Sequence, residues 1–316
     1  MDRRLIGALL VVAVAVTAAA LPALSGRRIS GHAQTIALPA DPRVGDCVLE
    51  SSPGSPDVVG ELTALPASTD GSRSAARSAI PVEVGACTGR PVLGEVVAVV
   101  TTSHHRLKAH PLPPPGVDCR SPALEYAGLV PADKRYELRD QPDADPVKWN
   151  FSINTGNRWV LPTQRLVSAG RTWSACVASP NAGGEYAGRL ADAYSGRSLP
   201  ASFGTCWNSP QVSAAARMLD CSRHHSAELI SAGRIDDISA VTSEQLTSSC
   251  EQLAALVMRR SDPTGGGALV IKTSPERISF GSAVRPVSVL CYLSSAGREL
   301  DDTVVGLGER PIPFAD

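Results

Sequence analysis

The chain has 316 residues and a net charge of −1, and only 4% of its residues are aromatic. A charge balance so close to neutral argues against a nucleic-acid-binding protein, which would carry a basic surface. The shortage of aromatic side chains limits the hydrophobic core, so we expect cross-links between the eight cysteines to help stabilise the fold.

The N-terminal region predicts export. An uncharged, apolar stretch from Leu5 to Leu24 follows a basic start. This order is typical of export signals, and about 20 apolar residues also suffice to span a bilayer. We therefore interpret residues 1–28 as a membrane anchor or as a signal peptide. An anchor would leave a single-pass protein with its C-terminal part outside the cytoplasm, whereas cleavage near Ala18-Ala19-Ala20 would release a secreted protein.

The eight cysteines form two successive sets of four with similar surroundings. In each set the first cysteine opens a strand after a turn, and the second follows an extended segment. The third lies on a predicted helix, and the fourth ends a closing strand. The first set is Cys47, Cys87, Cys119 and Cys176, and the second is Cys206, Cys221, Cys250 and Cys291. The sequence thus predicts two tandem modules.

The first module is predicted over residues 43–178, after a polar tether at residues 29–43. Two polar insertions within it, at residues 51–78 and 131–148, are expected to be surface loops. Residues 179–201 contain several glycines and prolines and predict a linker to the second module.

The second module is predicted over residues 202–293, and its helix has the clearest pattern. Thr242 and Gln245 are spaced as a capping box. An apolar stripe of helical periodicity follows, and it consists of Leu246, Cys250, Leu253, Ala254 and Val257. Residues 294–316 lie outside the predicted repeat, so we expect a partner-binding tail or a frayed end.

Cysteines of an exported protein are expected to form disulfides. Cys206 and Cys221 flank a predicted hairpin and should pair. Cys250 should face the core from its helix and meet the strand that carries Cys291. The same argument pairs Cys47 with Cys87 and Cys119 with Cys176. The predicted fold class is α+β, with each module a small antiparallel sheet, one packed helix and two disulfides.

Several short segments resemble the septum formation domain of exported actinobacterial proteins. In the first module these segments are Val44-Gly45-Asp46-Cys47 and the run from Gly170 to Cys176. In the second module, the segment Cys221-x3-His225-x2-Glu228 resembles the family's Cys-x3-His-x2-Glu. The resemblance covers both predicted modules as tandem copies, although the first lacks the histidine and the second opens with Thr205 in place of aspartate. It implies a link to septum formation, cell division or envelope growth, and no established catalytic activity.

His225 and Glu228 are the candidate binding residues. They could act as an acid and base pair, yet no nucleophile accompanies them. Alternatively, His225 makes a structural hydrogen bond near the strand start. A zinc site would draw on Cys221 and His224, with Cys206 and Cys250 as further thiolates. The first module keeps all its cysteines without these histidines, which argues against a shared metal. We therefore predict no catalytic residue, no metal and no cofactor.

Two further groups allow alternative interpretations. His104-His105, with the basic residues that follow, is either a solvated turn or a contact for an anionic envelope polymer or lipid. Four aromatic residues of the first module should fill its core or form a platform for a ligand. They are Trp149, Phe151, Trp159 and Trp173.

These features predict a non-enzymatic binding or scaffold protein of the cell envelope, held at the membrane by its N-terminal helix. Its expected partners are envelope or division proteins, and not nucleic acid. The sequence also allows two alternatives: an envelope hydrolase that uses His225 and Glu228, and a metal-binding envelope protein.

Overall fold

The structure is a computed structural model that describes residues 37–52, 54–64, 80–88, 90–101, 118–132, 135–141, 147–212, 216–237, 241–276 and 287–316. The predicted anchor or signal peptide, most of the tether and the His104-His105 group lie outside the described residues. Within the described part of the chain, no helix combines the length and apolar character that crossing a membrane requires.

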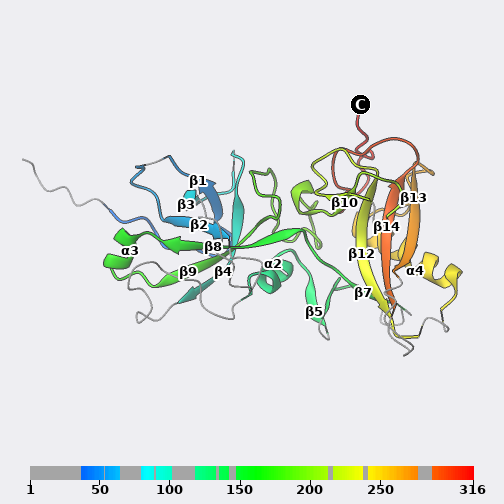
Figure 1. The fold of residues 1–316 in the computed structure, drawn as a ribbon, viewed down its shortest axis with the longest axis horizontal. Helices are drawn as coiled ribbons and strands as arrows, with labels where there is room; N and C mark the ends of the chain where they lie inside the picture. The colour runs from blue at the N-terminus through cyan, green and yellow to red at the C-terminus, as the bar shows by residue number, and fades with distance from the viewer. Residues whose placement is uncertain are drawn as a thin grey trace, which may run out of the picture. The chain divides into compact units, whose positions relative to one another are not determined.

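In the first half of the chain, antiparallel strands close into a six-stranded barrel, in the order β1-β3-β2-β8-β9-β4 (Figure 1). They are β1 (Cys47–Glu50), β2 (Gly60–Ala64), β3 (Ile80–Gly85), β4 (Gly94–Thr101), β8 (Thr155–Pro162) and β9 (Trp173–Pro180). The sheet is antiparallel as expected, but its closure into a barrel was not predicted. The difference comes from β2, which lies in the segment expected to be a loop and pairs with both β3 and β8.

In the second half the antiparallel strands form an open sheet, in the order β11-β10-β12-β14-β13. They are β10 (Cys206–Trp207), β11 (Met218–Leu219), β12 (Ala227–Ile235), β13 (Leu269–Glu276) and β14 (Val287–Ser295). Helix α4 (Ser243–Met258) packs against β12, β13 and β14 (Figure 1). An antiparallel sheet with one packed helix is the arrangement predicted for this module.

The α4 helix begins at the predicted capping box. The Thr242 hydroxyl accepts from the Gln245 backbone N–H at 3.1 Å, and the Gln245 side chain accepts from the Thr242 N–H at 2.8 Å. All members of the predicted apolar stripe are buried. In the first half, Cys119 occupies the N-cap position directly before the short helix α2 (Arg120–Tyr126) and does not lie within it. Other short elements are β5 (Val130–Ala132), β6 (Arg135–Glu137), α3 (Gln164–Ser168) and a 3-10 turn at Ala201–Phe203.

The two halves repeat one arrangement of five strands. The order β3-β1-β4-β9-β8 in the barrel corresponds to β11-β10-β12-β14-β13 in the open sheet. Both long strands, β4 and β12, also shift register against the closing strand at the same step, around Val97 and Ile230. Such a shift marks a β-bulge, where one residue is left out of the ladder. The matching strand order and register therefore support the repeat inferred from the cysteines.

Four disulfides join the cysteines as expected, two in each half. The pairs are Cys47–Cys87, Cys119–Cys176, Cys206–Cys221 and Cys250–Cys291. In each half one bridge fastens the first strand to the extended segment before β4 or β12. The other ties the helix to the closing strand, which supplies the cross-links that a core poor in aromatic residues needs.

Strand β7 (Lys148–Asn150) connects the two halves. It comes from the segment assigned to the first module but pairs with β12 of the second sheet. Trp149 is completely buried there, and its indole N–H donates to the Ser249 hydroxyl on α4 at 2.9 Å. Gly233 of β12 admits the ring, since a Cβ atom there would lie 2.7 Å from it. Residues 38–316 form one compact unit.

The expected linker, residues 179–201, and the expected tail, residues 294–316, make equivalent contacts. Each first forms a two-way backbone bridge to the start of the long strand, between Tyr186 and Val92 and between Leu300 and His225. Each then donates two backbone N–H groups to the carbonyls at the end of a helix. The donors and acceptors are Asp192 to Tyr126, Tyr194 to Ala127, Gly306 to Val257 and Gly308 to Met258. The tail is therefore packed as part of the repeated unit, and is neither frayed nor outside it.

Candidate functional site

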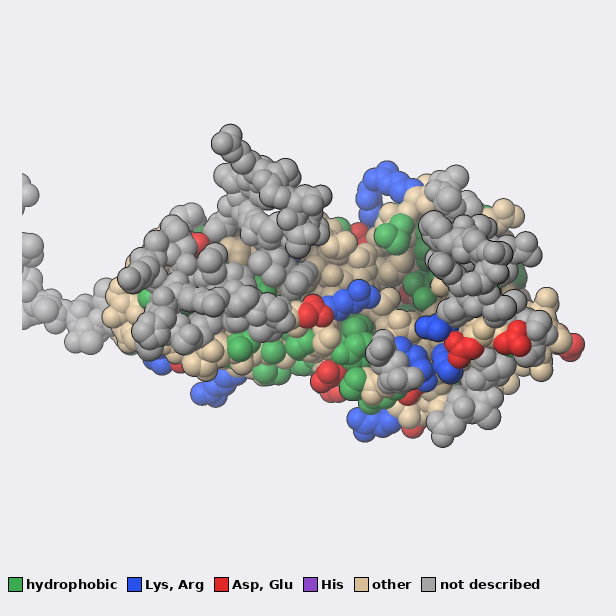
Figure 2. All heavy atoms as spheres, turned by 60° about the horizontal axis from the view of Figure 1, so that its bottom comes forward, with side chains coloured by type: hydrophobic (Ala, Val, Ile, Leu, Met, Phe, Trp, Pro, Cys, Tyr) green, Lys and Arg blue, Asp and Glu red, His purple; other side chains and the backbone are tan. Residues whose placement is uncertain are grey.

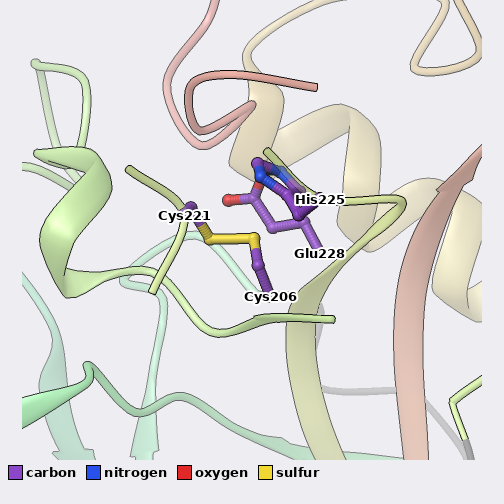
Figure 3. A group of neighbouring side chains, drawn as sticks. All are labelled: Cys206, Cys221, His225 and Glu228. Atoms are coloured by element: carbon purple, nitrogen blue, oxygen red, sulfur yellow. A yellow bond between two sulfur atoms is a disulfide. The ribbon is translucent and has the colours of Figure 1, made fainter. Parts of the chain in front are cut away.

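The candidate site lies where β10, β12 and the C-terminal tail meet. Strand β10 pairs with the start of β12, so that Cys206 lies opposite Glu228. The disulfide to Cys221 crosses this point, and His225 precedes β12 by two residues. Figure 3 shows the imidazole and the carboxylate of this pair next to the disulfide. None of the four side chains has exposed surface.

The ring of His225 is oriented by one hydrogen bond. Its Nδ1 atom lies 2.8 Å from the carbonyl oxygen of Arg223, which can only accept, so Nδ1 carries the proton. Burial lowers the pKa of His225, which favours the neutral ring. The Nε2 atom therefore presents a lone pair, and among the described residues it has no hydrogen-bond partner. It lies 4.0 Å from the Oε2 atom of Glu228.

The carboxylate of Glu228 fastens the tail. Its Oε1 atom accepts from the Thr303 hydroxyl, and its Oε2 atom accepts from the Val304 backbone N–H at 2.8 Å. Burial raises the pKa of Glu228 to about 7, although both hydrogen bonds act in the opposite direction. Near neutral pH, the site can thus hold a proton on Glu228 while His225 stays uncharged.

The equivalent position in the barrel contains Glu95, opposite Cys47 and beside the Cys47–Cys87 bridge. Glu95 is also completely buried, but its oxygens accept from four donors. These are the Tyr126 hydroxyl at 2.7 Å, the Tyr186 hydroxyl at 3.0 Å, Arg189 Nε at 2.9 Å and the Leu190 N–H at 2.5 Å. Val92 occupies the place of His225, so the barrel has the glutamate and the disulfide without the histidine.

The predicted zinc ligands are not brought together. The His224 side chain is 66% exposed and lies 3.8 Å from Glu299, and Cys250 belongs to the other disulfide. The structure instead groups Cys206, Cys221, His225 and Glu228, whose potential ligand atoms all lie within 4.8 Å of one another. The sequence did not indicate Thr303 or Arg189. Both follow the fourth cysteine of their set at a similar distance, 12 and 13 residues, which was the available signal.

The four aromatic residues singled out above are all buried, as the core interpretation predicts. Trp159 and Trp173 lie on barrel strands, whereas Trp149 belongs to the core under α4. Phe151 packs edge-on against Tyr194, with ring centroids 5.6 Å apart.

A surface hollow of roughly 440 Å³ lies beside the C-terminal end of α4. Its lining combines charge of both signs with the exposed Leu256, and includes Leu138, Arg139, Asp140, Asp192, Leu256 and Arg259. Figure 2 shows one face of the molecule, on which acidic and basic side chains lie close to each other among apolar ones. This mixture is more typical of a protein-binding surface than of a nucleic-acid-binding one.

The chain matches no family model, and comparisons with curated proteins and with solved structures also find no match.

Proposed function

We propose that the protein is a non-enzymatic binding or scaffold protein of the cell envelope, built from two septum formation-like modules. The observation that carries this proposal is that His225 and Glu228 make structural contacts inside the protein. Both side chains are fully buried: Glu228 accepts from Thr303 and Val304 of the tail, and the His225 ring bonds to the Arg223 carbonyl just before the strand. A hydrolase would need these atoms within hydrogen-bond distance of a substrate.

The disulfides and the N-terminal sequence support an extracytoplasmic location, because thiols pair outside the cytosol. In this proposal the apolar segment at residues 1–28 anchors the chain, and the disulfide-linked unit faces the envelope. Secretion after cleavage is the alternative. The two are distinguished by the N-terminal sequence of the mature protein and by its partition between membrane and medium.

The hollow beside α4 is the surface that we assign to a partner. A partner from the envelope or division machinery could cover the exposed Leu256 and pair its own charges with Arg139 and Asp140. Such a combination of an apolar centre and a charged rim is typical of protein interfaces.

Site-specific photo-crosslinking in intact cells tests this assignment. A photoreactive residue at Leu256 should give a discrete adduct with an envelope or division protein, and Arg139→Glu should remove the adduct. The same residue at Met218, which is 62% exposed on β11, is the matched control. The same adducts at both positions, insensitive to Arg139→Glu, would contradict the proposal.

The hydrolase alternative is tested separately. Full-length protein and its His225→Ala and Glu228→Ala variants are incubated with purified envelope polymers, and released fragments are measured. The proposal expects no release by any of the three. Release that requires both side chains would establish an enzyme instead.

A further inference from the structure

We propose that the Cys206–Cys221 bridge masks a zinc site, which forms when the disulfide is reduced. Its ligands are the two thiolates, the Nε2 atom of His225 and the carboxylate of Glu228. This inference goes beyond a scaffold function, because it gives the second half of the chain two states that a reductant and a metal interconvert.

The histidine is already arranged as a metal ligand. Its Nδ1–H donates to the Arg223 carbonyl at 2.8 Å, and metal-bound histidines almost always make such a contact with the other ring nitrogen. The free Nε2 atom is completely buried and has no hydrogen-bond partner among the described residues. A buried polar atom without a partner is costly, and a bound cation would remove that cost.

Glu228, Cys206 and Cys221 also lie close enough to His225 to share a metal ion with it. Glu228 has about four lone-pair sites, of which the contacts to Thr303 and Val304 use two. One potential ligand atom from each of the four residues lies within 4.8 Å of the others, and Nε2 of His225 lies 4.0 Å from Oε2 of Glu228. Tetrahedral zinc with two thiolates, a nitrogen and an oxygen needs separations of about 3.3–3.8 Å, so movements of about 1 Å suffice.

The disulfide controls the site. The two sulfurs are 2.04 Å apart in the bridge, so they cannot act as separate thiolates. A dithiol reductant transfers two electrons and two protons to the bridge, which yields two cysteine thiols and the oxidised, disulfide form of the reductant. Zinc then displaces the thiol protons, and any proton on Glu228, into solvent. Reoxidation by a disulfide reverses both steps and releases the metal.

The barrel provides an internal control. Cys47, Cys87 and Glu95 form the corresponding group, also within 4.8 Å. Val92 replaces the histidine, and the Arg189 guanidinium lies 2.9 Å from the carboxylate, where it would repel a second cation. Reduction of Cys47–Cys87 should therefore produce two thiols that bind no zinc.

Differential alkylation of the full-length chain tests the inference. The protein is reduced with a water-soluble phosphine, which becomes its oxide, with or without Zn²⁺. It is then alkylated briefly and each cysteine is quantified by mass spectrometry. Zinc should slow alkylation of Cys206 and Cys221 by about tenfold or more, because bound thiolates react slowly, and should leave Cys47 and Cys87 unchanged.

A ligand variant completes the test. His225→Phe keeps a ring of similar size and should lower the zinc affinity of the reduced chain by more than about 100-fold, since partners that merely orient a ligand are worth about 10–100-fold. Equal protection of all cysteines by zinc, as in an unfolded chain, would overturn the inference. The inference would also be overturned if zinc did not protect Cys206 and Cys221, or if the oxidised chain bound one zinc ion. The same holds if zinc protected these cysteines equally well in His225→Phe.

Discussion

Glu95 and Glu228 occupy equivalent positions but differ in their partners. Glu95 has a guanidinium and three further donors, whereas Glu228 has one hydroxyl and one backbone N–H. In the barrel the charge of the carboxylate is compensated by Arg189. In the second half it is not, and burial raises the pKa of Glu228 to about 7. The two residues should therefore respond differently to loss of charge.

For Glu228 the expected effect is a pH dependence. Its folded-state pKa is above the ordinary value of 4.5, so the folded chain binds the proton more tightly than the unfolded chain. The contribution of this group to the free energy of unfolding is therefore fully present at a pH below its ordinary pKa, and it is lost as the pH rises to about 7. As the pH rises from the ordinary value to about 7, the free energy of unfolding of Glu228→Gln should therefore increase by about 3 kcal/mol relative to that of wild type.

Urea unfolding of both proteins across this pH range measures the difference. The lowered pKa of His225 gives an opposite slope in both proteins, which cancels in the comparison. Stability curves that run parallel over the whole range would show that Glu228 is ionised in the folded state.

For Glu95 the expected effect is a loss of stability. Glu95→Gln leaves the Arg189 charge without its partner, close to the partly buried Tyr126 hydroxyl and the buried Tyr186 hydroxyl. Removing one member of a buried pair typically costs about 3–5 kcal/mol, and the partial exposure of Arg189 lowers the expectation to about 2–3 kcal/mol. Urea unfolding at neutral pH checks this value. If Glu95→Gln destabilises the chain less than Glu228→Gln does at the same pH, the roles assigned to the two glutamates are wrong.

At the scale of single elements, α4 illustrates a helix that its sequence predicts. Its capping box and apolar stripe are local patterns, and both agree with the structure. Thr242→Ala removes the N-cap contact and should lower the free energy of unfolding by about 1 kcal/mol. Thr247→Ala, within the same helix, removes only a hydroxyl bonded to the Ser243 carbonyl and should cost less. Equal losses in chemical denaturation would show that the cap does not stabilise the helix.

The docking of β7 on β12 depends on the absence of a side chain. Gly233→Ala would place a Cβ atom 2.6 Å from Val147 and 2.7 Å from the Trp149 ring. We expect a loss of about 1–3 kcal/mol from this overpacking. Gly85→Ala on β3 is the matched control, because nothing lies within 4 Å of its Cβ position. Thermal unfolding of both variants should separate them, and similar melting temperatures would contradict the close contact.

The sequence predicted the elements that carry cysteines and missed others for identifiable reasons. Strands β8 and β13 contain proline and polar residues, which weaken the alternating pattern of a strand. Strand β2 lies in a segment rich in Ser, Gly and Pro, and its role depends on pairing with β8, about 100 residues away. For the site, the sequence indicated His225 and Glu228 but not their tail partners, because such contacts have no local signature.

For the whole molecule, the continuous core argues for cooperative unfolding. Trp149 lies under α4, and Phe151 contacts Tyr194, so the core extends across both halves. We expect wild type with intact disulfides to unfold in one transition. Trp149→Ala should cost about 3–5 kcal/mol and separate this transition into two. Calorimetry distinguishes these outcomes, and two transitions in the wild type would mean that the halves unfold independently.

The bulge at the same step of β4 and β12 has an evolutionary consequence. A bulge is a specific irregularity, and the same one recurs beside an equivalent disulfide, buried glutamate and returning segment. These coincidences point to duplication of one ancestral gene segment, which extended past the fourth cysteine to include the returning segment. The two copies now differ in two respects: β2 closes the ring in the first half, and a histidine lies next to the glutamate only in the second.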